Sequence, residues 1–135
     1  MACAFCAIAG GEAPAHVVLD TERVVAFLDR RPLFAGHTLV VPREHVVTLR
    51  DLDGPMRDEL FARVQDVAAA VQDALGADGT FVAENNVVSQ SVPHLHVHVV
   101  PRRFKDGLRG FFWPRGKYGP GEAEAVAATL RAALA

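Results

Sequence analysis

The chain has 135 residues, of which 50% are hydrophobic and 22% are charged, a composition typical of one globular domain rather than of a disordered segment. Its formal net charge is −2, so we expect neither nucleic acid nor an anionic membrane surface as a partner. The first residues lack the basic and apolar regions of a signal peptide, and no apolar run is long enough to span a membrane, which predicts a cytoplasmic location.

Five short β-branched runs predict the strands of a sheet. The first two flank Thr21 and Glu22, which predicts a hairpin, and the third follows Gly36 and ends at Pro42. Two more runs follow a long helix. The five runs span residues 15–20, 23–29, 37–43, 80–85 and 94–101.

The clearest helix is predicted to open at Asp53–Gly54–Pro55 and to end before Gly76. Pro55 suits the first turn of a helix, and Gly76 suits the residue that ends one. Apolar residues recur at steps of three and four and predict one apolar stripe, which comprises Met56, Leu60, Val64, Val67, Val71 and Leu75. A last helix is predicted over residues 122–134, because its acids stand in the first turn.

This order of elements predicts an α+β fold with a mainly antiparallel five-stranded sheet, one long central helix and a C-terminal helix. No repeat or linker interrupts the chain, so we expect one domain over residues 1–135, with its core in 1–103. Residues 104–135 add a loop rich in basic and aromatic residues, among them Trp113, and then the last helix. This loop either anchors an aromatic ring on the domain or clamps phosphates with arginines and a base with a ring.

Three histidines alternate with apolar residues in the stretch "SVPHLHVHVVPRR". Side chains of a strand alternate between its two faces, so His94, His96 and His98 share one face at spacings of roughly 6.7 Å. A solvated edge strand would mix several polar residue types. A metalloenzyme of H-x-H type would need a carboxylate where Arg102 or His98 stands. Nucleophilic attack on phosphorus fits better, because a neutral imidazole needs no base to activate it.

Several blocks of the chain resemble the histidine-triad (HIT) superfamily. "PHLHVHVVPR" resembles its H-x-H-x-H signature, and "VVAFLDRRPLFAGHTLVVPREH" resembles its block around A-F-x-D and G-H-x-L. "FCAIAGGEAPAHVVLD" and "SQSVPHLH" resemble the opening of the family and its approach to the active strand. The resemblance implies a homodimer that cleaves nucleoside phosphate bonds, with substrates such as nucleoside phosphoramidates and dinucleoside polyphosphates.

The resemblance also implies roles for single residues. His96 matches the nucleophile, His98 matches a contact to the phosphate, and His37 matches a fourth histidine that supports them. Ser91 matches a hydroxyl near the scissile phosphate. A purine nucleotide of the AMP type would contact Phe5, Ile8, Phe27, Asp29, Leu39, Asn86, Gln90, Ser91 and His98, with Asn85 as an alternative to Asn86. Asp29 would accept the ribose hydroxyls, because a carboxylate is an acceptor only.

The two cysteines, Cys3 and Cys6, have C-x-x-C spacing near the N-terminus. They could be a redox pair, two small buried residues or half of a zinc site, which needs four ligands. One class of HIT proteins binds zinc through two cysteines and two histidines, so the resemblance implies a structural zinc held also by His45 and His94.

Two other functions remain open from the residues alone. A nucleotide-binding sensor would bind AMP without a covalent intermediate. A metal-dependent hydrolase would use His96 as a metal ligand. The apolar stripe of the central helix and the exposed edge of the sheet further suggest a two-fold homodimer.

Overall fold

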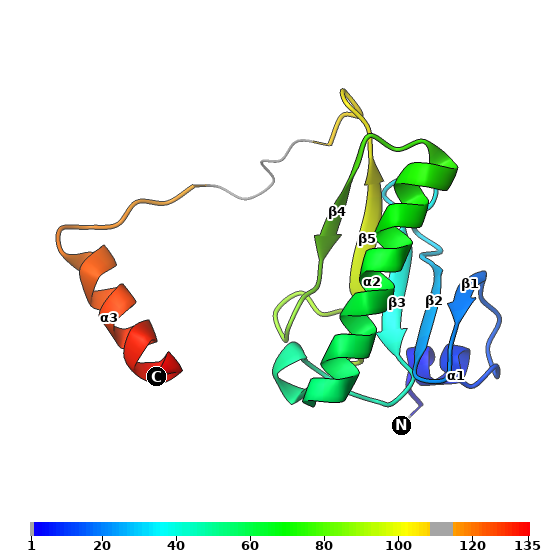
Figure 1. Cartoon of the computed structure of the whole chain (residues 1–135), viewed down its shortest axis with the longest axis horizontal. Helices are drawn as coiled ribbons and strands as arrows, with labels where there is room; N and C mark the ends of the chain where they lie inside the picture. The colour runs from blue at the N-terminus through cyan, green and yellow to red at the C-terminus, as the bar shows by residue number, and fades with distance from the viewer. Residues whose placement is uncertain (1, 109–114) are drawn as a thin grey trace.

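A computed structural model describes residues 2–108 and 115–135 of the chain. A five-stranded sheet is covered on one face by the long helix α2 (Gly54–Leu75), and the short helix α1 (Ala4–Ala9) lies beside β1 and β2 near the N-terminus (Figure 1). The predicted α+β class with an antiparallel sheet, a long central helix and a C-terminal helix is therefore confirmed.

The strands pair in the order β1-β2-β3-β5-β4, and every pair is antiparallel. The predicted hairpin is present at β1 and β2, where the Thr21 N–H and hydroxyl both donate to the Val24 carbonyl. The strands are β1 (Val17–Asp20), β2 (Val24–Leu28), β3 (Thr38–Pro42), β4 (Gly79–Ala83) and β5 (Val97–Arg102).

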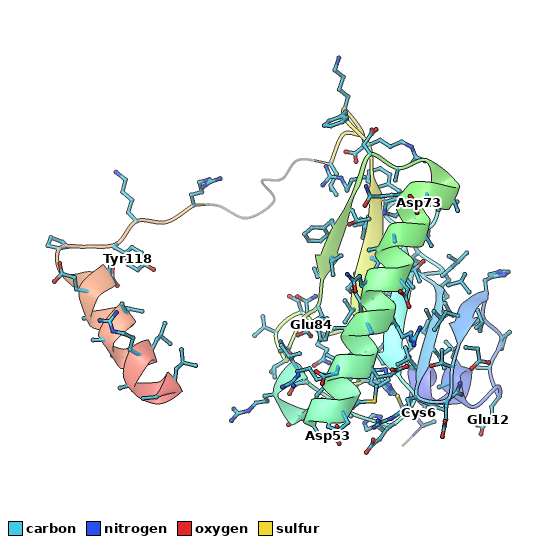
Figure 2. All side chains as sticks on the ribbon, in the orientation of Figure 1. Cys6, Glu12, Asp53, Asp73, Glu84 and Tyr118 are labelled. Carbon is cyan, nitrogen blue, oxygen red and sulfur yellow. The ribbon has the colours of Figure 1, made fainter. Side chains whose placement is uncertain are left out.

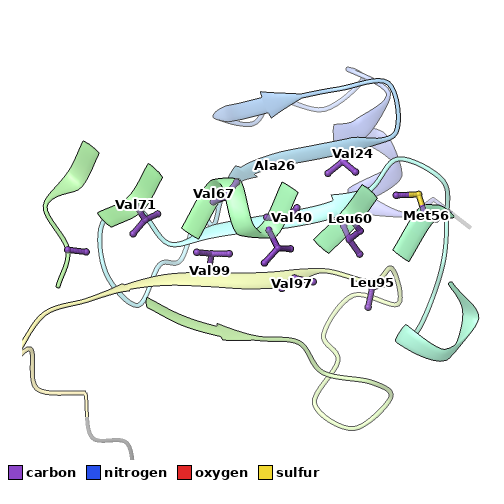
Figure 3. Packing of buried hydrophobic residues seen from close by; sticks show 12 residues of the cluster. Val24, Ala26, Val40, Met56, Leu60, Val67, Val71, Leu95, Val97 and Val99 are labelled. Atoms are coloured by element: carbon purple, nitrogen blue, oxygen red, sulfur yellow. The ribbon is translucent and has the colours of Figure 1, made fainter. Parts of the chain in front are cut away.

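Helix α2 packs its apolar stripe on the sheet and forms the main core (Figure 3). The Asp53 carboxylate accepts from the Met56 N–H at 2.8 Å and caps the start, while Gly76 ends the helix with φ 69°. The stripe residues Met56, Leu60, Val64, Val67 and Val71 are buried, whereas Leu75 is 48% exposed. Because five of the six stripe residues are buried within the chain, the stripe does not support the predicted dimer, which stays a prediction.

A second, smaller apolar cluster lies on the other face of the sheet under helix α1. Phe5 and Ala9 of the helix pack against Phe27 and Leu39 of the strands. The Arg43 guanidinium donates to the Ala9 carbonyl and pairs with the Asp20 carboxylate, so the end of α1 is tied to β1. This cluster holds the N-terminal helix against the histidine-bearing part of the sheet.

Three local features differ from the sequence prediction. Helix α1 and the 3-10 turn Leu49–Asp51 were not predicted, because elements of six and three residues are too short to show a periodic pattern. Strand β5 begins at Val97 rather than at residue 94. Before it, the Leu95 N–H donates to the Val46 carbonyl, outside the sheet ladder.

Helix α3 (Glu122–Leu134) has the predicted bounds, but none of its residues is buried. It lies apart from the sheet and α2 in Figure 1, and its apolar residues Val126, Leu130 and Leu134 are exposed. Trp113 lies outside the described residues. Among the helices that the structure does describe, none is long and apolar enough to cross a lipid bilayer.

Candidate active site and metal centre

The sequence-predicted histidines meet at one end of the sheet, in two adjacent groups. The first group is the imidazole cluster, defined here as His37, His96 and His98. The second is the cysteine–histidine cluster, defined as Cys3, Cys6, His45 and His94. The side chains of His94, His96 and His98 point away from α2, because Leu95, Val97 and Val99 between and after them point into the α2 core (Figure 3). The predicted alternation across the histidine stretch is thus confirmed.

His96 is held by its own main chain. Its Nδ1 lies 2.8 Å from the His94 carbonyl oxygen, which can only accept, so Nδ1 carries the proton and Nε2 keeps a lone pair. The Phe5 ring packs edge-on against the imidazole, with the ring centroids 5.0 Å apart, and the side chain is only 4% exposed. In the neutral ring, this contact therefore leaves the lone pair on Nε2.

His98 and His37 form a hydrogen-bonded pair next to His96. The two ring centroids of His96 and His98 are 5.1 Å apart, and His37 Nε2 lies 2.9 Å from His98 Nδ1. Strand register brings the pair together, since Leu39 of β3, two residues after His37, is opposite His98 of β5. The Leu33 N–H donates to His37 Nδ1 at 3.0 Å.

Burial keeps this pair uncharged. Desolvation, and then the neighbouring imidazoles of His96 and His37, lower the pKa of His98 to about 4, against a smaller opposing effect of Asp29. Burial also lowers the pKa of His37, again opposed by the Asp29 carboxylate. His98 is therefore neutral at physiological pH.

Asp29 lies next to the His37–His98 pair. Its Oδ2 lies 3.7 Å from His37 Nε2, and its Oδ1 accepts from the Arg31 N–H at 2.9 Å. The side chain is 22% exposed, so one oxygen edge can still meet a ligand. The predicted role of Asp29, to accept the ribose hydroxyls, stays a prediction.

The cysteine–histidine cluster has the composition and the spacing of a closed zinc site. His94 Nδ1 lies 3.4 Å from both Cys3 Sγ and Cys6 Sγ, and His45 Nδ1 lies 3.3 Å from Cys6 Sγ. In a tetrahedral site with zinc–ligand bonds of about 2.3 Å to sulfur and 2.0–2.1 Å to nitrogen, sulfur and nitrogen ligands would be about 3.6 Å apart. These three sulfur–nitrogen distances thus differ from the tetrahedral value by only a few tenths of an ångström.

Proton positions in this cluster also suit a metal. His94 Nε2 lies 2.8 Å from the Pro42 carbonyl oxygen, so Nε2 carries the proton and the Nδ1 lone pair faces both sulfurs. Burial, and then Cys3, raise the pKa of the Cys6 thiol, so a second negative sulfur is unfavourable until a cation lies between them. All four predicted ligands are brought together, and they fit zinc.

The apolar residues predicted to surround a base are mostly packed within the domain. Phe27 and Leu39 are 3% and 5% exposed, and Phe5 contacts Phe27 with ring centroids 5.4 Å apart. Ile8 is half-buried at the rim of the same cluster. Phe5 lies between the two cysteines in the sequence and against His96 in space, so it links the two groups.

Asn86 and Gln90 engage the protein itself. The Asn86 side-chain Oδ1 accepts from the Leu49 N–H at 2.8 Å, and the Gln90 side-chain amide donates to the Val47 carbonyl at 2.6 Å. Both therefore hold the loop before the histidines, residues 84–91, against residues 47–49. A direct contact of either side chain with a nucleotide stays a prediction, as does one of the exposed Ser91.

Sequence reasoning missed two features of this loop. Glu84 accepts from the Asn86 amide at 2.5 Å, and its other carboxylate oxygen is buried without a partner among the described residues. Val87 and Ser89 have φ of 68° and 62°, the left-handed region that disfavours a β-branched residue.

Comparison with known proteins relates the whole domain to one family. The model of the HIT domain matches residues 10–105. Over 128 residues the chain is 33% identical to an adenosine 5′-monophosphoramidase of Schizosaccharomyces pombe, an alignment that covers 93% of both proteins.

Solved structures agree with this relation. A crystal structure of a HIT family member from Bacillus subtilis matches with a TM-score of 0.90 and 32% identity, covering 100% of this chain and 99% of the other. A zinc-bound histidine triad protein from Mycobacterium smegmatis matches with a TM-score of 0.76 and 38% identity, covering 98% of both chains.

Proposed function

The chain belongs to the HIT domain family, and from that premise we propose that it cleaves a nucleoside phosphate bond through a nucleotidyl-histidine intermediate. We infer a substrate of the AMP type, either a nucleoside phosphoramidate or a dinucleoside polyphosphate. The observation that carries the proposal is the His94 carbonyl at 2.8 Å from His96 Nδ1, which leaves Nε2 as a free nucleophile.

The proposed reaction has two displacements at the same phosphorus. In the first, the His96 Nε2 lone pair forms the phosphorus–nitrogen bond while the bond to the leaving group breaks, and the leaving group takes a proton from solvent. In the second, water forms a phosphorus–oxygen bond and gives up one proton to solvent, the phosphorus–nitrogen bond breaks, and His96 is restored. His98 contacts a phosphoryl oxygen, and His37 orients His98 through the 2.9 Å contact. Ser91 is proposed near the scissile phosphate.

Binding of the nucleoside is assigned to the residues around the imidazole cluster. Asp29 is proposed to accept the ribose hydroxyls through its exposed oxygen edge. Ile8 offers half-buried apolar surface to the base, with Phe5, Phe27 and Leu39 packed behind it. An amine leaving group is favoured by the monophosphoramidase name of the S. pombe relative.

Zinc is proposed as a structural ion at Cys3, Cys6, His45 and His94. The four donor atoms already lie within 4.8 Å of one another, and a closed tetrahedral site leaves no position for water. When bound, zinc supplies a rigid link between α1 and the segment that carries His96.

We also infer that the single domain of residues 1–135 forms a two-fold homodimer in the cytoplasm. With the stripe of α2 buried, the supporting observations are the outer edge of β4, with Val82 43% exposed, and the exposed apolar side of α3. Sedimentation at micromolar concentration tests this inference, and a single species with the mass of one chain contradicts it.

A turnover screen separates the proposed activity from its two rivals. Adenosine phosphoramidate, diadenosine polyphosphates and adenylyl sulfate are offered in turn, and products are identified. Hydrolysis with a trapped nucleotidyl-protein supports the proposal. AMP binding without turnover of any substrate favours a sensor. Loss of turnover within seconds of adding a chelator, with the fold intact, favours a metal-dependent hydrolase.

A further inference from the structure

The main-chain N–H of Leu33 contacts His37 in a way that the proposed function leaves unexplained. It donates to His37 Nδ1 at 3.0 Å, from a loop between β2 and β3. We propose that this N–H sets the direction of the proton in the His37–His98 pair and thereby makes His98 Nε2 a hydrogen-bond donor toward the substrate. Leu33 is thus a positioning residue that acts through its backbone.

The first step concerns His37. A nitrogen that accepts from an N–H must carry a lone pair, so Nδ1 of His37 is unprotonated. A neutral imidazole has one proton, which must then lie on Nε2. The nearest acceptor for that proton is His98 Nδ1 at 2.9 Å, whereas Asp29 Oδ2 at 3.7 Å is beyond hydrogen-bond distance.

The second step carries the proton order to His98. Because His98 Nδ1 accepts from His37, its own proton lies on Nε2, the nitrogen directed away from the pair. His96 has the opposite arrangement, with its proton on Nδ1 and its lone pair on Nε2. Two adjacent imidazoles therefore offer one lone pair and one N–H.

One lone pair and one N–H are what the proposed reaction needs. This part of the inference rests on the proposed function. The lone pair of His96 attacks phosphorus, and the N–H of His98 donates to a phosphoryl oxygen or to the leaving group. If His98 Nδ1 instead donated its proton to His37 Nε2, His98 Nε2 would present a second lone pair, which would repel the phosphoryl oxygens.

The same proton position in His37 opposes the binding of a metal ion by Asp29, His37 and His98. Their ligand atoms lie within 4.8 Å of one another, and the same holds for the cysteine–histidine cluster. A metal on His37 Nε2 would take the place of the only ring proton, while the Leu33 N–H keeps Nδ1 unprotonated. The ring would have to become an imidazolate, which is costly near neutral pH.

The loop holds the Leu33 N–H in place independently of the leucine side chain, which is 54% exposed. The Asp29 N–H donates to the His37 carbonyl at 2.9 Å, and the His37 N–H donates to the Phe34 carbonyl at 3.0 Å. Gly36 has φ 101° and closes the turn. The chain from residue 29 to residue 37 thus forms a tight frame around the imidazole.

Nuclear magnetic resonance of the unmodified protein tests the assignment directly. With uniform ¹⁵N labelling, we expect the chemical shifts of His37 and His98 to show the proton on Nε2 of both rings and that of His96 to show it on Nδ1. We also expect scalar couplings through the hydrogen bonds, from the Leu33 amide nitrogen to His37 Nδ1 and from His37 Nε2 to His98 Nδ1. A proton on Nδ1 of His37 overturns the proposal.

A pair of substitutions separates the N–H from the side chain. Leu33→Pro removes the N–H, and Leu33→Ala keeps it while removing most of the side chain. We expect Leu33→Ala to keep the wild-type tautomer ratio at His37 and Leu33→Pro to raise the minor tautomer about tenfold, equivalent to about 1.4 kcal/mol, the size of one hydrogen bond. The same minor form in both variants overturns the proposal.

Turnover of the proposed substrate adds a separate readout. We expect kcat of Leu33→Pro to fall about tenfold below that of Leu33→Ala, with KM changed less. Equal kcat values with shifted tautomers would overturn the link to catalysis. If no substrate is turned over by the wild type, the proposed function fails, whereas the tautomer measurement still decides the role of the N–H. If Leu33→Pro does not fold, the couplings in the wild type decide it.

Discussion

His94 and His98 stand four residues apart on one segment and on the same side of the sheet, yet their rings are prepared for different chemistry. His94 Nε2 donates to the Pro42 carbonyl, so the lone pair on Nδ1 of the same ring faces two sulfurs. At His98 the Nδ1 nitrogen meets the His37 imidazole instead. Because imidazole has one proton for two nitrogens, the partner of one nitrogen decides what the other can do. One group suits a metal, and the other suits phosphoryl chemistry.

Replacing His96 tests the chemical half of this comparison and has the largest expected effect. We expect His96→Ala to lower kcat at least about a thousandfold while AMP binding remains, because the covalent route through Nε2 is lost. Single-turnover kinetics and calorimetric titration with AMP measure the two quantities.

Zinc content is the matching control for that variant. His96 belongs to the imidazole cluster, so His96→Ala should keep one zinc per chain. Residual activity above a few per cent of wild type would contradict its role as the nucleophile. If His96→Ala contained no zinc, His96 would be a metal ligand, and that result would support a metal-dependent hydrolase.

Removing both thiols tests the metal half of the comparison. Cys3→Ser combined with Cys6→Ser should abolish zinc binding and lower the free energy of unfolding by about 4 kcal/mol, because a metal clip between α1 and the sheet is lost. Metal analysis and urea unfolding with and without a chelator provide the measurements. Protein that was grown with ample zinc and contains none would show that these cysteines are only a buried or redox pair.

Much of the domain follows from residue patterns alone. Asp53, Pro55 and Gly76 predict both ends of α2, and the three- and four-residue spacing predicts the side that packs on the sheet. Alternation in the histidine stretch predicts which side chains share a face. These features depend on local geometry, so a single sequence contains them.

Other features depend on partners far away in the chain. The side chains of Asn86 and Gln90, whose contact with a nucleotide stays a prediction, form hydrogen bonds with the main chain of residues 47–49, which only the fold brings close. The Leu33 N–H and the His94 carbonyl leave no trace in side-chain identity, because they are main-chain groups. The proton positions that distinguish the two histidine clusters could therefore not be predicted from the sequence.

A substitution in the turn before His37 is expected to have a smaller effect on stability. A methyl group on Gly36 would lie 2.5 Å from the Leu75 side chain, and φ there is 101°. We expect Gly36→Ala to lower the free energy of unfolding by about 3 kcal/mol, from backbone strain and overpacking together. Gly76→Ala is the matched control, since φ is 69° but no atom lies within 4 Å, and we expect about 1 kcal/mol. If both variants lost the same free energy of unfolding in urea, the Leu75 side chain would have moved aside without cost and the turn would not be tightly packed.

The smallest expected effect is the pH dependence that His98 contributes. Its pKa is about 4 in the folded chain and near 6.5 in the unfolded chain, so between these values the unfolded chain binds a proton that the folded chain excludes. The contribution to stability is complete above pH 6.5 and is lost as pH falls toward 4. We expect wild type to lose on the order of 1 kcal/mol more than His98→Asn between pH 7 and pH 5, measured by urea unfolding with zinc present. His16→Asn, at an exposed histidine, should follow wild type. Parallel losses in wild type and His98→Asn would mean that His98 gains its proton as readily in the folded chain as in the unfolded one, and the neutral donor assigned to it would not exist at pH 5.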